Sequence, residues 1–106
     1  MERRKRVAWM NEKDDVILEY LDRIYPAAEP PAVVYENLHR CDDVLDFTQR
    51  TGGFSIDTLR NRMRRLEDVG LIDVVVKEGR YRVITEEGRQ YLRGDLDVSD
   101  LETRHE

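Results

Sequence analysis

The sequence predicts a mainly α-helical domain that carries one small β-hairpin. Three observations predict it: apolar residues recur at helical spacing in several segments, two β-branched runs follow one another closely, and glycines and prolines separate these segments. The chain has 106 residues, of which 40% are hydrophobic, enough for one domain with a small core. We expect that domain over residues 10–94, between a basic N-terminal arm (1–9) and an acidic C-terminal tail (95–106).

The first helix is expected over residues 12–25. Asn11 can cap its first turn, and Asp14 at the third helical position interacts favourably with the helix dipole. Pro26 ends the helix. Its apolar stripe consists of Ile17, Leu18, Leu21 and Ile24.

A second helix begins near Pro31, because a proline in the first turn loses no hydrogen bond, and it ends near Arg40. The sequence does not assign residues 41–54 to a single element. Val44, Leu45 and Phe47 can form a short helical turn, and Gly52-Gly53 indicates a flexible loop.

The clearest helix spans residues 56–69. Ser55 is a good N-cap, and Gly70 occupies the position where a left-handed residue ends many helices. The helix has one narrow apolar stripe: Ile56, Leu59, Met63 and Leu66.

Residues 72–76 and 81–84 are predicted strands, joined through 77–80 as a hairpin. Alternation with Tyr81 and Val83 predicts that Arg82 faces away from the core. Thr85 then caps a closing helix over 86–92, and we expect Tyr81 and Tyr91 to pack against the first helix. The tail is either weakly ordered or docked through its apolar residues Leu96, Val98 and Leu101.

The order helix, helix, loop, helix, hairpin, helix is typical of a winged helix-turn-helix domain. In that fold the second helix of the pair enters the major groove of DNA, and the hairpin, or wing, contacts the flanking backbone or minor groove. The predicted reading helix, 55–69, displays polar residues opposite its apolar stripe. The candidate DNA-binding residues there and on the wing are Ser55, Asp57, Thr58, Arg60, Asn61, Arg62, Arg64, Arg65, Lys77, Arg80 and Arg82.

These residues are expected to have different roles. Base contacts are predicted for Thr58, Asn61 and Arg65, because amide, hydroxyl and guanidinium groups match base edges in the major groove. Phosphate contacts are predicted for the remaining three arginines of the helix, Arg60, Arg62 and Arg64. Asp57 can accept a hydrogen bond from cytosine or orient an arginine. The alternative for these arginines is ion pairing within the helix, Arg60 with Asp57 or Arg64 with Glu67 or Asp68.

The charge distribution agrees with this assignment although the net charge is −5. Residues 60–82 hold seven bases and four acids, whereas residues 10–50 hold ten acids and four bases. Segregated positive charge of this kind is typical of phosphate-binding surfaces. The basic run from Arg3 to Arg6 is either a minor-groove arm or a flexible, soluble start of the chain.

Other classes of function find little support in the residues. His39 and Cys41 with two adjacent aspartates resemble a fragment of a metal site, but a closed zinc site needs four ligands and no second such pair exists. No phosphate-binding glycine loop or nucleophile motif is present, so we expect no enzyme, no cofactor and no metal. A single cysteine, no apolar stretch long enough for a bilayer and no signal-peptide core predict a cytoplasmic, nucleoid-associated protein without membrane partners.

Several segments resemble small haloarchaeal winged-helix proteins of the phage phi-H repressor-like family. The matching segments are residues 9–10, 15–21, 31–38, 58–66, 69–72, 81–88, 91–92 and 94. The resemblance implies repression by operator binding, usually as a dimer, and it does not imply an effector ligand. Residues 40–54 depart from the pattern, since they exceed a usual turn. Of 18 basic residues 15 are arginine, which fits a high-salt cytoplasm, although a GC-rich genome favours arginine as well.

The sequence therefore predicts a sequence-specific transcriptional regulator that binds double-stranded DNA. The alternative is a winged helix used as a protein-interaction module, whose arginine-rich helix meets an acidic partner; single-stranded nucleic acid is a third candidate. A homodimer is also predicted, because four apolar residues near the C-terminus have no assigned place in the core: Leu92, Leu96, Val98 and Leu101.

Overall fold

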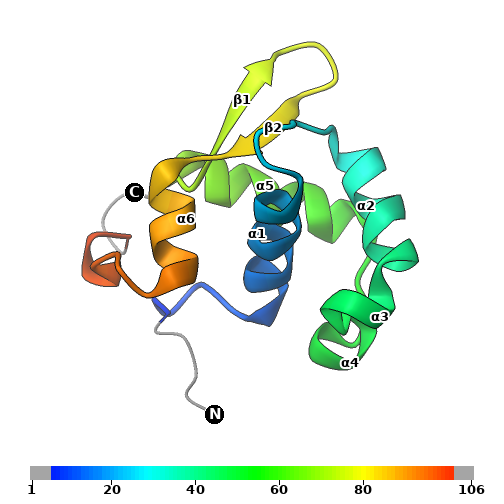
Figure 1. Cartoon of the computed structure of the whole chain (residues 1–106), viewed down its shortest axis with the longest axis horizontal. Helices are drawn as coiled ribbons and strands as arrows, with labels where there is room; N and C mark the ends of the chain where they lie inside the picture. The colour runs from blue at the N-terminus through cyan, green and yellow to red at the C-terminus, as the bar shows by residue number, and fades with distance from the viewer. Residues whose placement is uncertain (1–5, 102–106) are drawn as a thin grey trace.

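The computed structural model describes residues 6–101. It confirms the coarse prediction of a mainly helical fold with a small antiparallel sheet (Figure 1). The elements are α1 (Glu12–Ile24), α2 (Pro31–Arg40), α3 (Asp42–Leu45), α4 (Phe47–Thr51), α5 (Ile56–Asp68), β1 (Ile72–Val76), β2 (Tyr81–Ile84), α6 (Glu86–Arg93) and the 3-10 helix η1 (Val98–Asp100).

Helix α1 lies at the centre, with α6 on one side and α2 on the other (Figure 1). The predicted cap is confirmed: the Asn11 side chain accepts from the N–H of Lys13, and the Asp14 carboxylate accepts from the N–H of Asn11 at 2.9 Å. The predicted apolar stripe is largely buried, since Ile17, Leu18 and Leu21 have no exposed surface and Ile24 packs at the edge of the core.

The segment between α2 and α5 forms two short helices, α3 and α4, rather than one turn. They are separated by Asp46, whose φ of 53° is left-handed. Leu45 and Phe47 are buried, and this burial holds the two helices against the core. Arg50 of α4 also donates to Glu19 of α1 at 2.7 and 2.8 Å, so ion pairs attach this segment to the central helix.

Helix α5 has the predicted cap and stripe. The N–H of Thr58 donates to the Ser55 hydroxyl at 3.2 Å, and Leu59, Met63 and Leu66 are fully buried. The predicted glycine end is confirmed as well, because Gly70 has a φ of 88°.

The hairpin pairs Ile72 with Ile84 and Val76 with Tyr81, with a bulge between Val74 and Val76. A single bridge adds a third chain segment beside β2: Glu29 and Arg82 exchange backbone hydrogen bonds of 3.0 and 3.1 Å. The segment before α2 is thereby fixed to the hairpin.

Two predictions for the hairpin are wrong. Arg82 is only 2% exposed and faces inward, whereas Tyr81 is 39% exposed. The reason is the two-residue period of a strand: Ile84 lies in the core, so Arg82 shares its face and Tyr81 takes the other. The prediction for Tyr91 is confirmed, since its hydroxyl donates to Asp15 of α1 at 2.5 Å.

The segment after α6 is docked on the domain. Leu101 is fully buried in the core, and Leu92, Leu96 and Val98 pack against that core. These four residues motivated the expectation of a homodimer, and the chain's own packing uses them.

We predict that Leu101→Ala lowers the free energy of unfolding by about 2–4 kcal/mol, because it opens a cavity in the core. Val44→Ala serves as the control, since Val44 is exposed, and should change stability by no more than about 0.5 kcal/mol. Urea denaturation followed by circular dichroism measures both. Equal, small effects would show that the C-terminal segment contributes nothing to the core.

Candidate nucleic-acid interface

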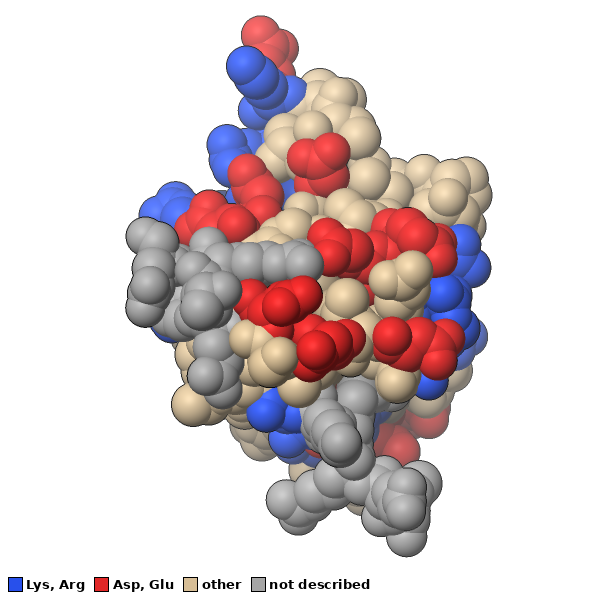
Figure 2. Space-filling view, turned by 90° about the vertical axis from the view of Figure 1, so that its left-hand side faces the viewer, with Lys and Arg blue, Asp and Glu red and all other residues tan. Residues whose placement is uncertain are grey.

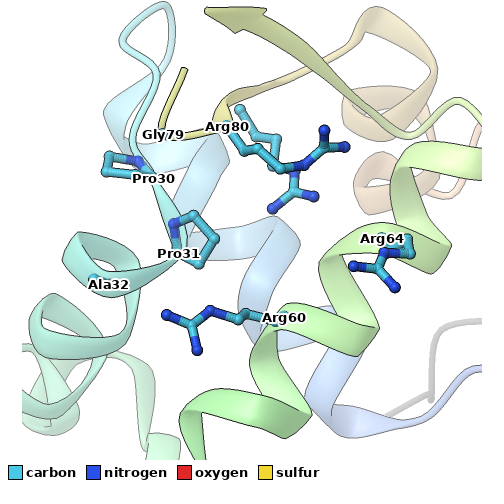
Figure 3. A pocket seen from close by; sticks show the side chains of 8 residues that line it. Pro30, Pro31, Ala32, Arg60, Arg64, Gly79 and Arg80 are labelled. Carbon is cyan, nitrogen blue, oxygen red and sulfur yellow. The ribbon is translucent and has the colours of Figure 1, made fainter. Parts of the chain in front are cut away.

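A basic cleft lies between the N-terminus of α2, the exposed side of α5 and the tip of the hairpin. Its volume is about 380 Å³. Figure 3 shows Arg60 extending from α5 toward Pro31, and Arg80 entering the same space from the hairpin. The cleft is lined by Pro30, Pro31, Ala32, Arg60, Arg64, Gly79, Arg80 and Arg82. Two successive elements, α5 and the hairpin, therefore bring four guanidinium groups together opposite the N-terminus of α2.

The exposed side of α5 contributes two of these arginines. Arg64 makes no hydrogen bond or ion pair with any residue between 6 and 101 that the structure describes. Arg60 lies 3.6 Å from Asp57, and their side chains are 54% and 85% exposed. An exposed pair of this length is weak. Ion pairing within the helix is thus present for Arg60 and absent for Arg64, so both guanidinium groups can bind an external anion.

The hairpin contributes the other two arginines, which share the carboxylate of Glu67 on α5. Arg80 donates to both Glu67 oxygens at 2.8 and 3.0 Å, and Arg82 donates to Oε1 at 3.1 and 3.2 Å. Burial lowers the pKa of Arg82, and the hydrogen bonds to Glu67 oppose this effect. Arg80 is about half exposed at the turn, where its φ is 53°. The buried arginine is structural, and the exposed one is available to a ligand.

Arg62 and Arg65, although predicted to contact DNA, pack against the N-terminal segment. Arg62 donates to the carbonyl oxygen of Trp9 at 3.0 Å and lies 3.4 Å from the carboxylate of Asp14. Arg65 stacks over the Trp9 ring at 5.0 Å. Neither lines the cleft. Helical spacing placed them on or beside the polar side of α5, but the residues before α1 cover that flank.

The other candidate residues lie outside the cleft. The Ser55 hydroxyl donates a hydrogen bond to the Thr58 hydroxyl at 3.2 Å within the helix cap. Asn61 is exposed on α5 next to Arg60 in sequence, and Lys77 is exposed on the hairpin. Asp57 is exposed at the start of α5. Of these candidates on α5, Asn61 is the one that is neutral, exposed and outside the helix cap.

Arg6 belongs to the predicted N-terminal arm but is engaged with the domain. Its guanidinium donates to Asp15 at 2.7 and 3.0 Å and to Glu12 at 2.9 Å. The other residues of the predicted basic run, Arg3, Arg4 and Lys5, lie outside the described residues.

Two features of the cleft have no counterpart in the sequence-based prediction. The sequence predicted only that a helix starts near Pro31, not that residues 30–32 form a wall of the cleft. For Glu67 it predicted only a possible ion pair with Arg64. A proline pair before a helix is a signal for its start, but nothing local indicates that this start faces α5. The position of Glu67 under two hairpin arginines likewise depends on tertiary contacts.

Negative charge gathers on a different face. Figure 2 shows acidic side chains crowding the side of the molecule on which α6 and η1 lie in Figure 1. Exposed acids of this region are Glu86, Asp95, Asp97 and Asp100. Among the described residues, the acidic side chains of α6 and η1 thus lie on another face than the four arginines of the cleft.

No family model, curated protein or solved structure matches this chain. None of the helices within residues 6–101 has the length and apolar composition that crossing a bilayer requires. Over the same residues, no three His, Cys, Asp or Glu side chains gather where they could share a metal ion. An assignment of function therefore depends on the geometry of the cleft and of the exposed side of α5.

The buried Asp14, which faces Arg62, gives a test of this packing. Burial raises its pKa to about 6, although the hydrogen bond from Asn11 and the charge of Arg62 lower it. A carboxyl group with a raised pKa stabilises the fold fully while protonated, and this contribution is lost as pH rises through 6. Asp14→Asn cannot ionise and escapes that loss.

We predict that the stability of Asp14→Asn relative to the parent rises by on the order of 3 kcal/mol between pH 4 and pH 8. Urea denaturation across this range measures it, with the exposed Asp57→Asn as control. A difference between Asp14→Asn and the parent that does not change with pH would contradict the burial of an ionisable Asp14.

Proposed function

We propose that this chain is a winged helix-turn-helix protein that binds double-stranded DNA sequence-specifically and regulates transcription. The order of elements supports the fold assignment. In this assignment α2 and α5 are the helix pair, joined through α3 and α4, and β1 and β2 are the wing. The bridge between Glu29 and Arg82 fits the short third strand that borders such a wing.

One observation carries the proposal: the exposed side of α5 presents Arg60, Asn61 and Arg64 next to the basic tip of the hairpin. Helix α5 has 13 residues; one side of it is buried in the core and the other is exposed. Such a helix can enter the major groove, about 12 Å wide, with its exposed polar side toward the bases. The hairpin then lies over the neighbouring backbone. Asn61 is assigned to an adenine edge, and Arg60, Arg64 and Arg80 to phosphates.

In this proposal, the acidic face of the molecule orients the protein on the duplex and does not increase its affinity for DNA. Its negative face repels the phosphate backbone, so that the cleft side is the one that meets the duplex. In high salt, phosphate contacts contribute less because each counterion released into a concentrated salt solution gains less entropy. Specific base contacts must then supply a larger share of the binding.

Selection from a pool of randomised duplexes in molar potassium chloride, followed by footprinting, tests the proposal. We expect enrichment of one defined sequence and protection of that site. A two-fold symmetric site with half-sites about one helical turn apart would also establish the homodimer. Failure to enrich any sequence would instead favour the protein-interaction module, with the arginines of α5 facing an acidic partner.

We predict that Arg64→Ala weakens binding to all duplexes and reduces the slope of log K against log salt by about 1, since one phosphate contact is lost. Arg93→Ala is the matched control: it removes the same charge from α6, where Arg93 pairs with Glu86 and Asp95. Fluorescence anisotropy against salt measures both variants. Equal effects of the two would show that only net charge matters.

Asn61→Ala is predicted to relax the preference at a single base pair by about 1–3 kcal/mol while leaving the salt slope unchanged. Competition among duplexes that differ at one position measures the preference. A uniform loss across all positions would remove Asn61 from the reading of sequence.

A further inference from the structure

The cleft has more positive charge than its neighbouring carboxylates balance. Of its four arginines, Arg80 and Arg82 share the one carboxylate of Glu67, while Arg64 has no ion pair with a described residue. Arg60 has only its long, exposed pair with Asp57. The surplus is therefore two to three positive charges within one small volume, which suits a dianion better than a monoanion.

The two hairpin arginines of the cleft differ in whether they can exchange Glu67 for a ligand. Arg82 is buried, so Glu67 must remain its counter-ion. Arg80 is half exposed and can exchange Glu67 for a ligand without leaving any buried charge unpaired. Together with Arg60 and Arg64, this gives three exposed guanidinium groups that approach one space from two elements (Figure 3).

The opposite wall of the cleft is apolar. Pro30 and Pro31 have no backbone N–H, and with Ala32 they present carbon surface toward the arginines. A volume of about 380 Å³ lies within the range of small-molecule sites, roughly 300–1,000 Å³, and leaves space beside a phosphate group for an organic ring. Such a pairing of cationic donors with an apolar wall fits an amphipathic anion.

We propose that the cleft binds a small phosphorylated molecule, with its phosphomonoester on Arg60, Arg64 and Arg80 and its organic part against Pro30–Ala32. A tetrahedral phosphate dianion can accept from several guanidinium groups at once, whereas a carboxylate offers two oxygens and one charge. This inference rests on the proposed function in one respect: the ligand occupies arginines assigned to the duplex, so it acts as an effector that releases DNA.

Phosphate oxygens can also come from the DNA backbone, so the experiment separates the two sources. The full chain is first unfolded thermally with increasing inorganic phosphate, at constant ionic strength set with sodium chloride and without DNA. Phosphate raises the Tm of most proteins by exclusion from their surface. Specific binding is therefore measured as a saturating rise in Tm that the parent shows in addition to the rise shown by Arg64→Ala and Arg60→Ala.

We expect the parent and Arg93→Ala to show the saturating rise, and either cleft variant to weaken apparent phosphate binding roughly tenfold, as loss of one charge-assisted hydrogen bond would do. Both replaced side chains are exposed, so neither substitution opens a cavity in the core. An identical response of all four proteins would overturn the proposal.

The second step uses a fluorescent duplex taken from the selection and adenosine 5′-monophosphate as competitor, with adenosine as the uncharged control at the same ionic strength. Displacement by the nucleotide but not by the nucleoside supports the effector role. If Arg64→Ala weakens duplex binding while neither phosphate nor the nucleotide has an effect, the cleft takes only backbone phosphate and this proposal is wrong. If phosphate raises the Tm of the parent as expected but the selection enriches no duplex, the anion site is supported and the DNA-binding proposal is wrong.

Discussion

The ion pair between Glu67 and Arg82 fixes the part of the structure on which every proposed contact depends. Arg82 is nearly without exposed surface, and its backbone forms the bridge to Glu29 on one side of β2. Loss of Glu67 would leave the buried charge of Arg82 without compensation, and an uncompensated buried charge typically costs about 3–5 kcal/mol. The pair connects α5, the hairpin and the segment before α2, and these three form the cleft. Its geometry thus follows from one buried charge.

Arginines serve two different purposes in this molecule. Arg6, Arg50, Arg62 and Arg82 join separate segments through ion pairs with acids of α1 and α5. Arg60, Arg64 and Arg80 remain exposed around the cleft. A planar guanidinium suits both purposes, since it can donate to several acceptors at once and stays charged when partly buried. The high ratio of arginine to lysine therefore has a structural explanation.

The helices and the hairpin were predictable from the sequence because their signals are local. The cap at Ser55, the stripe from Leu59 to Leu66 and the glycine at position 70 each specify structure within a few residues. Which residues of β2 face the core was not predictable in this way. Val83 and Ile84 are both apolar, and only packing decides which one enters the core. Arg82 was misplaced for that reason.

The site was predictable in its central part and not at its borders. The outward position of Arg60, Asn61 and Arg64 follows from helical geometry alone. Arg62 and Arg65 lie on a flank that the residues around Trp9 cover, and that contact joins positions more than 50 residues apart in the chain. The apolar wall at Pro30 and Pro31 depends in the same way on tertiary packing. Long-range contacts of this kind have no local signature in one sequence.

Amide chemical-shift mapping with a selected duplex tests whether the cleft side of α5 binds DNA. We expect addition of the duplex to shift the amide signals of the outer side of α5, of residues 77–82 and of Ala32, and to leave those of α6 and η1 in place. Shifts centred on α6 and η1, or no shifts with any duplex, would contradict the assignment of the cleft side of α5 as a DNA-binding surface.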